Sequence, residues 1–163
     1  MHKHEFSEPA ALSSVAKFHD VFNLPVLSTP AIPSKERCNL RYSLLAEELQ
    51  ELKEAMESGD IVEAADALAD LQYVLSGAVL ELGLGHLFKQ LFDEVQRSNM
   101  SKTCQTIEEA RATQSHYLES KGIESYIVER EGEYLVYRKE DGKVLKSVNY
   151  SPANLAAIVG DSV

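Results

Sequence analysis

The sequence predicts a mainly α-helical protein: a bundle of four to five helices, then a small C-terminal antiparallel β meander and a short terminal helix. Apolar residues recur every three to four positions over most of residues 9–120, and capping residues precede several of these stretches. Between residues 125 and 148 the apolar residues instead alternate with others, as in strands. We therefore expect a helical domain over residues 1–122 and an appendage over residues 123–163, packed on the same domain.

The first two expected helices are separated by a proline-rich stretch. The first helix runs from about Pro9 to Phe22, and three prolines before residue 34 keep the following chain extended. Ser34 can cap the second helix, which continues to about Ser58. Its apolar residues are spaced by alternating steps of four and three, so we expect them to face the core: Cys38, Tyr42, Leu45, Leu49, Leu52 and Met56.

The third helix begins at Asp60, with Glu63 as its capping partner, and ends at Gly83 after about Leu82. Because only a short break separates the second helix from the third, we expect the two to fold back antiparallel.

The rest of the chain completes the bundle and forms the appendage. A fourth helix is expected over residues 86–98, and a fifth from Thr106, with Glu109 as capping partner, to about residue 120. The expected meander over residues 125–148 has three strands, with glycine-containing turns at residues 131–132 and 141–142. Pro152 then favours the start of a short terminal helix.

Composition excludes several classes of function. The 163 residues include 16 Lys and Arg against 26 Asp and Glu, a net charge of −10, which would repel nucleic acids and anionic membranes. No apolar stretch follows the polar N-terminus, and the longest apolar region, residues 67–82, is interrupted by four polar residues. Only two cysteines, Cys38 and Cys104, are present. We expect a soluble cytoplasmic protein with buried free thiols.

Carboxylates on the second and third helices are the informative feature. The second helix carries the pattern EExxE, and two aspartates of the third helix lie one turn apart on one face. Most acidic residues on helices are simply solvated, and Glu47, Glu54 and Glu57 taken alone fit that interpretation. The carboxylates in question are Glu47, Glu48 and Glu51, then Glu63, Asp66 and Asp70.

Asp70 does not fit the solvated interpretation, because apolar residues flank it on nearly every side. We expect it to be buried, and a buried carboxylate must be protonated, paired or bound to a metal ion. No Lys or Arg occurs between Lys53 and Lys89, so no local cation can pair with it. Carboxylates facing each other across antiparallel helices predict a site for Mg²⁺, or Mn²⁺, rather than zinc. A di-iron site is excluded because the chain has no Glu-x-x-His pair.

A second cluster of polar residues closes the fourth helix: Arg97, Ser98, Asn99, Ser101 and Lys102. These residues can be read as helix-terminating and surface residues. They can equally be read as donors to phosphate oxygens, in a chain that is otherwise acidic. The spacing alone does not choose between the two interpretations.

Taken in order, these motifs resemble the all-α nucleoside triphosphate pyrophosphohydrolase superfamily, and in particular its MazG and phosphoribosyl-ATP pyrophosphohydrolase-like branch. The resemblance extends to Phe18-His19-x-x-Phe22, to the Arg41-x-x-Leu44 approach to EExxE, and to the tail at residues 141–147, so it covers most of the chain. One position departs from the family pattern. Many members have a glutamate three residues before the final aspartate, where this chain has Ala67, so the fourth ligand would be Asp66 or Glu63.

The resemblance implies a four-helix core that binds Mg²⁺ and cleaves the α–β phosphate bond of a nucleoside triphosphate, releasing a monophosphate and pyrophosphate. Residues matching the family's ligand positions are Glu48, Glu51 and Asp70, with Asp66 as the candidate fourth ligand. Residues expected near the phosphates are Asn99 and Lys102, with Arg97 beside them. A glutamate of the first motif that is free of metal, Glu47 or Glu51, could accept the proton of the attacking water.

Helix geometry separates the adjacent glutamates of the second helix. If the apolar seam is set at zero, Glu48 lies about 80° to one side and Glu51 about 140° to the same side, on the flank of Arg41 and Leu44. Glu47 lies about 180° from the seam. We therefore expect Glu48 and Glu51 to be direct metal ligands and Glu47 to contact water or lie in an outer shell.

Two further expectations concern the base and the assembly. The base could be held by aromatic residues near the first helix, although each is more often a core residue and His19 is expected to be a satisfied core histidine: Phe18, His19, Phe22 and Tyr73. The third helix is more apolar than a single short bundle covers, so we expect a homodimer or tetramer with active sites near the interface.

The leading functional hypothesis is a Mg²⁺-dependent nucleotide pyrophosphohydrolase that removes unwanted nucleotides. One alternative is the phosphoribosyl-ATP pyrophosphohydrolase of histidine biosynthesis, which we rank lower because this chain is longer and carries a β appendage. The other alternative is a metal-binding helical interaction protein without enzymatic activity.

Overall fold

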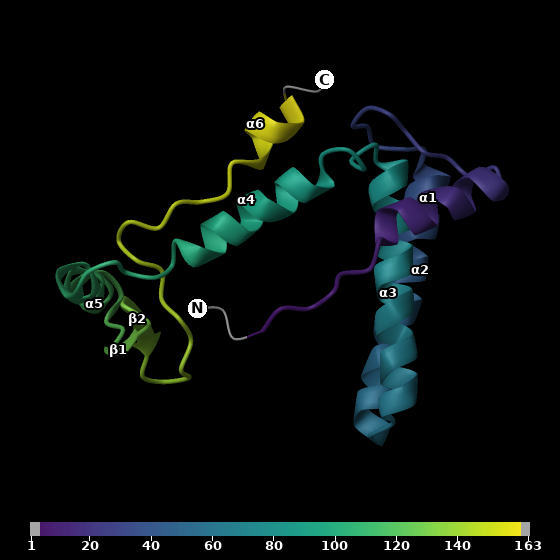
Figure 1. The fold of residues 1–163 in the computed structure, drawn as a ribbon. Coiled ribbons are helices and arrows are strands. Elements are labelled where there is room, and N and C mark those ends of the chain that lie inside the picture. Colours follow the sequence, from purple (N-terminus) through teal and green to yellow (C-terminus); the bar gives the residue numbers. More distant parts are fainter. Residues whose placement is uncertain (1–3, 161–163) are drawn as a thin grey trace. The chain divides into compact units, whose positions relative to one another are not determined.

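The computed structural model describes residues 4–160, which form six α-helices and one antiparallel hairpin (Figure 1). The mainly helical class predicted from the sequence is therefore confirmed. The elements are α1 (Ala11–Val21), α2 (Lys35–Ser58), α3 (Ile61–Glu81), α4 (Phe88–Met100), α5 (Ile107–Lys121), β1 (Ser125–Arg130), β2 (Glu133–Arg138) and α6 (Leu155–Gly160).

The described residues divide into two compact units. The first contains residues 4–88 and 159–160, and the second contains residues 89–158. This division differs from the boundary after residue 122 expected from the change in apolar spacing, which stays a prediction about domains.

Helices α2 and α3 form an antiparallel pair in the first unit, and Figure 1 shows α1 crossing the pair at the end away from its turn. Capping fixes the start of both long helices. The Ser34 hydroxyl accepts from the backbone of Arg37 at 3.4 Å, and Asp60 accepts from the amides of Val62 and Glu63 at 3.0 and 3.1 Å. Gly59, with φ of 73°, closes α2. The predicted helix boundaries and antiparallel turn are thus confirmed here.

The apolar seam predicted for α2 is only half covered in the single chain, where Cys38, Leu45 and Leu52 are partly buried. Its residues Tyr42, Leu49 and Met56 are 74%, 59% and 63% exposed. The neighbouring flank faces α3 instead, where Ala55 of α2 is buried together with Ala64 and Ala67 of α3. These small side chains allow the two helices to pack closely. The spacing of apolar residues predicts an apolar stripe on a helix but not which other element covers it.

The expected burial of Asp70 is also wrong, because this residue is exposed in the single chain. The reason is the same as for the seam of α2. Two of the apolar residues that surround it in sequence, Leu68 and Leu75, are themselves 55% and 39% exposed. Apolar neighbours in sequence therefore do not enclose a helical residue when part of the helix surface lacks a partner.

The second unit has its own core around α5 and the hairpin. The buried residues that form it are Cys104, Ala110, Val136 and Leu145. Strands β1 and β2 pair in register from Ser125 with Arg138 to Arg130 with Glu133. Both cysteines are free thiols as expected, although only Cys104 is fully buried.

The third strand of the predicted meander is reduced to a single bridge between Tyr137 and Val144. A tight turn precedes it, in which Arg138 pairs with Asp141 and the Asp141 carboxylate accepts from the amide of Lys143 at 3.1 Å. The chain then leaves the hairpin, because the amide of Ser147 donates to the carbonyl of Lys102 at 3.2 Å rather than to β2.

Gly83 lets the chain after α3 approach another segment of the first unit closely. It has a φ of 69°, and a Cβ at this position would lie 1.9 Å from the carbonyl oxygen of Thr29. Among residues 4–160, no helix is long and apolar enough to cross a membrane.

Candidate active site

Glu48 is the unusual carboxylate of the α2–α3 pair. Its Oε2 atom is buried and has no hydrogen-bond partner. Partial burial raises the pKa of Glu48 above its ordinary value, and the carboxylates of Asp70, Glu51, Glu47 and Asp66 raise it further. The structure therefore brings negative charge from both helices towards one carboxyl group.

The surrounding carboxylates are more open to solvent than Glu48. Glu47 and Glu51 are exposed on α2, and Asp66 and Asp70 are exposed on α3. Within residues 4–160, no three His, Cys, Asp or Glu side chains are arranged closely enough to hold a metal ion. The donor set nevertheless suits a hard divalent cation, since it consists of oxygens only and includes a buried oxygen without a partner.

A buried ion-pair network lies on the same face of α2 and was not found from the sequence. Glu81, which is 1% exposed at the end of α3, accepts from Arg37 Nε at 3.0 Å and forms ion pairs with Arg37 and Arg41. Burial raises the pKa of Glu81, but the hydrogen bonds from the two arginines outweigh this effect and lower it overall. The signal was a single acid within an apolar stretch, the same signal that was attributed to Asp70.

His19 of α1 joins this network. Arg41 Nη2 lies 3.2 Å from His19 Nε2, and because arginine can only donate, Nε2 accepts. His19 Nδ1 then donates to the carbonyl of Pro25 at 2.9 Å. His19 is 1% exposed, so the expectation of a satisfied core histidine is confirmed.

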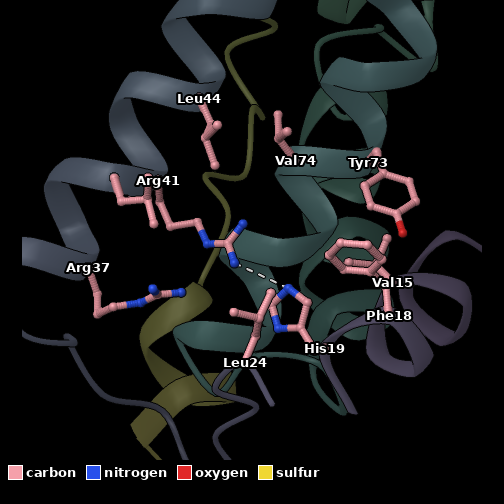
Figure 2. Close-up of a pocket in the computed structure, with 10 residues that line it drawn as sticks. Val15, Phe18, His19, Leu24, Arg37, Arg41, Leu44, Tyr73 and Val74 are labelled. Atoms are coloured by element: carbon pink, nitrogen blue, oxygen red, sulfur yellow. Dashed lines mark hydrogen bonds between the residues drawn. The ribbon is translucent and has the colours of Figure 1, made fainter. Parts of the chain in front are cut away.

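A cavity of about 200 Å³ opens beside the network (Figure 2). Aromatic rings form one wall: Phe18 and Tyr73 meet edge to face with centroids 5.8 Å apart, and both are 39% exposed. Arg41 reaches in from α2, and its Nε atom is buried without a hydrogen-bond partner. The cavity is lined by Val15, Phe18, His19, Leu24, Arg37, Leu40, Arg41, Leu44, Tyr73 and Val74.

The cavity and the carboxylates are neighbours along the two helices. Leu44 precedes Glu48 by one turn of α2, and Asp70 precedes Tyr73 and Val74 by one turn of α3. Gly77 makes room for the guanidinium, because a Cβ there would lie 2.5 Å from Arg41 Nη1 and 3.2 Å from His19 Nε2. One face of α2 thus presents the buried Arg41 donor at the apolar cavity and, one turn after Leu44, the Glu48 carboxylate as an acceptor.

The residues expected near the phosphates belong to the second unit. Lys102 Nζ donates to Asn99 Oδ1 at 2.8 Å, so these two lie together after α4. Arg97 is bound elsewhere: it pairs with Glu94 through two hydrogen bonds of 2.8 Å and donates to the carbonyl of Pro152 at 3.1 Å. The role of all three toward a substrate stays a prediction.

Comparison with known proteins shows that the region from α1 to α4 matches a known family. Residues 15–99 match the family model described as phosphoribosyl-ATP pyrophosphohydrolase, from α1 to the end of α4. An uncharacterised protein of Acanthamoeba polyphaga mimivirus is 36% identical over 94 residues, which are 53% of this chain and 38% of the viral protein. The chain therefore spans well under half the length of this curated relative.

The raised pKa of Glu48 predicts how the stability of the metal-free protein depends on pH. The folded state holds this proton more tightly than the unfolded state, so the stabilisation is present at low pH and is lost as pH rises through the folded pKa. We expect Glu48→Gln to increase the free energy of unfolding at neutral pH and to change it little at acidic pH. Urea unfolding in a chelator at both pH values measures the difference.

Glu47→Gln is the matched control, because it removes the adjacent charge from an exposed position. Glu81 has the opposite pH dependence, since a lowered pKa stabilises the fold at pH values above the ordinary pKa of a glutamate. The wild type and each variant share this contribution, so it cancels in the comparison. If Glu48→Gln destabilises the protein at neutral pH, the Glu48 carboxyl has a partner that this arrangement does not contain.

Proposed function

The chain belongs to the phosphoribosyl-ATP pyrophosphohydrolase family, part of the all-α nucleoside triphosphate pyrophosphohydrolase superfamily, and on this premise we propose that it is a Mg²⁺-dependent nucleotide pyrophosphohydrolase. The proposed reaction cleaves the α–β phosphate bond of a nucleoside triphosphate and releases a monophosphate and pyrophosphate. The observation that carries the proposal is the buried, unpartnered Glu48 oxygen among carboxylates, one turn from an apolar cavity.

The proposed metal-binding residues are Glu48, Glu51, Asp70 and Asp66, and Glu63 is the alternative to Asp66. When bound, Mg²⁺ would neutralise the phosphate oxygens and activate a water molecule for attack. Glu48 is the best supported of these residues, because a cation would supply the partner that its buried oxygen lacks. The net charge of −10 means that a triphosphate would otherwise be repelled.

The exposed glutamates of α2 would handle the proton. Glu47 or Glu51 would accept it from the attacking water, whichever is free of the cation. Both side chains are exposed next to Glu48, so water can reach them.

The cavity would hold the nucleobase. Its volume of about 200 Å³ and its aromatic wall suit a flat ring, and the free Arg41 Nε–H can donate to a ring nitrogen or carbonyl oxygen. At this cavity Arg41 offers only hydrogen-bond donors. A base that presents an acceptor toward α2 is therefore favoured, whereas the identity of that base is left to experiment.

The phosphates would be bound by Asn99 and Lys102. Their mutual hydrogen bond already orients both side chains. Arg97 would join them only by exchanging its bonds to Glu94 and Pro152 for phosphate oxygens.

Two other functions remain to be separated from this proposal by experiment. The family model's own name favours phosphoribosyl-ATP as the substrate, and the same catalytic groups would serve that reaction. A helical protein that binds a metal ion without turnover would retain the cation and lack the hydrolysis.

We also propose that two or more copies assemble through α2 and α3. Each helix exposes apolar residues seven positions apart, which lie nearly on one line along a helix. These are Tyr42, Leu49 and Met56 on α2 and Ile61, Leu68 and Leu75 on α3. A second copy would cover this apolar surface, which is extensive for a monomer, and would enclose the exposed Asp70.

Hydrolysis should yield pyrophosphate from at least one nucleotide in a panel of ribo- and deoxyribonucleoside triphosphates and phosphoribosyl-ATP, and only with Mg²⁺ or Mn²⁺. The assay measures orthophosphate before and after addition of inorganic pyrophosphatase. Orthophosphate should appear only after this addition. Direct release of orthophosphate would contradict the proposed bond, and no turnover of any substrate would favour the binding protein.

The two adjacent glutamates should differ in their effect on the rate. Glu48→Gln should lower kcat/KM by more than about a hundredfold because it removes a direct ligand, whereas Glu47→Gln should lower it by about tenfold or less. Steady-state kinetics across a Mg²⁺ titration measures both. A larger effect of Glu47→Gln would assign the metal to the other face of α2.

Light scattering should give a mass of at least two chains at micromolar concentration. Leu49→Glu should shift the protein toward the monomer, because it places a charge in the proposed interface. Leu118→Glu on α5 is the matched control, since Leu118 is 55% exposed against 59% for Leu49. A wild-type monomer, or equal effects of the two variants, would contradict assembly through α2 and α3.

A further inference from the structure

The C-terminal segment of the second unit lies against the end of α4, about 50 residues away in sequence. The Ser101 hydroxyl accepts from the amide of Ser151 at 3.0 Å, and Ser98 shares a 3.1 Å hydrogen bond with the Tyr150 hydroxyl. The amide of Ser147 donates to the carbonyl of Lys102 at 3.2 Å. Several hydrogen bonds thus join the two segments.

Lys146 is held at a fixed place in this segment. Its neighbours Leu145 and Ser147 are 6% and 4% exposed, whereas Lys146 itself is exposed. The amide of Leu145 donates to the carbonyl of Val136 at 2.8 Å, so the backbone on that side is tied to β2. The Lys146 ammonium lies over the Tyr150 ring, 4.3 Å from its centroid.

Positive charge gathers at the Tyr150 hydroxyl. The hydrogen bond with Ser98 lowers the pKa of Tyr150, and the ammonium groups of Lys146 and Lys102 lower it further. In the part of the chain that the structure describes, neither ammonium forms an ion pair with a carboxylate. Two such lysines acting on one hydroxyl are unexpected in a chain with 26 acidic and 16 basic residues.

Two carboxylates of the second unit, Glu94 and Glu109, are engaged by other donors. Glu94 accepts from Arg97 and from the amide of Asn154 at 2.8 Å, and these interactions lower its pKa to about 2. Glu109 accepts from Ser147 and from the amide of Gln105. Neither Glu94 nor Glu109 forms an ion pair with Lys102 or Lys146 among the described residues, so both ammonium groups are free to bind an anion.

We propose that Lys146 and Tyr150 form, with Lys102 and Asn99, a binding site for a polyphosphate anion on the second unit. Two ammonium groups, a phenol and a carboxamide offer several donors to the oxygens of a phosphoanhydride. The ligand class rests on the proposed function, whereas the site rests on contacts within the second unit. The C-terminal segment then has a binding role, although it lies outside the residues that match the family model.

The test measures binding of inorganic tripolyphosphate to the full chain by isothermal titration calorimetry, in a chelator so that no turnover occurs. Lys146→Met should weaken binding by about tenfold, because it removes the charge and keeps the stem. Lys143→Met, at an exposed position of the same segment, should weaken it by less than about twofold. Equal losses in both variants, or no binding by the wild type, would overturn the site.

Two conservative variants keep the test decisive if Lys146→Met unfolds. Lys146→Arg should retain binding, and Tyr150→Phe should weaken it severalfold while keeping the ring beneath Lys146. Unchanged affinity in Tyr150→Phe together with lost affinity in Lys146→Arg would contradict the proposal. A chain that binds tripolyphosphate through Lys146 but hydrolyses no nucleotide keeps this site and loses the proposed activity. A chain that hydrolyses a nucleotide but binds tripolyphosphate equally well without the Lys146 ammonium keeps the proposed activity and loses this site.

Discussion

The buried carboxylate of Glu81 is the constraint on which the first unit depends. A charge at this position must be compensated, and breaking such a buried pair typically costs about 3–5 kcal/mol. The compensation comes from Arg37 and Arg41 of α2 rather than from α3 itself, so the pairing sets which face of α2 turns toward α3. Arg41 also contacts His19, which brings α1 and the carbonyl of Pro25 into the same arrangement.

The order of side chains along that face of α2 explains why a cavity and a carboxylate cluster lie next to each other. Paired arginines come first, Leu44 follows at the cavity, and Glu48 follows one turn later. The face thus changes from compensated positive charge through an apolar surface to a carboxyl group whose pKa is raised. A nucleotide is complementary to this order, since its flat base suits the apolar surface and its phosphates need the cations that a carboxylate binds.

Local signals in the sequence were sufficient for the helices but not for their faces. Ser34, Asp60 and Gly59 fix helix ends through bonds within a few residues, which is why these limits could be predicted. The seam of α2 and the burial of Asp70 depend on what covers each helix, and this information is not local. The prediction of a third strand was wrong for a related reason. The amide of Ser147 bonds to the carbonyl of Lys102, which is remote in sequence, instead of to β2.

The candidate site shows the same division. Helix geometry placed Glu48 on the flank of Arg41 and Leu44, and this flank faces α3 in the structure, although the stripe used as the reference is only half covered. The stretch around Asp70 contains no basic residue, but the partners of Glu81, Arg37 and Arg41, come from α2, which is remote in sequence. A buried acid on one helix is better tested against the basic residues of every helix that can pack on it.

The absence of a side chain at position 77 has a consequence for how substrate preference could change during evolution. The Arg41 guanidinium occupies the space that a methyl group would take, so it depends on a residue that does not line the cavity. Adding one carbon there would displace the Arg41 guanidinium and reshape the cavity without changing the identity of any lining residue. The ligand selectivity of such a cavity can therefore change through a substitution at a position that does not line it.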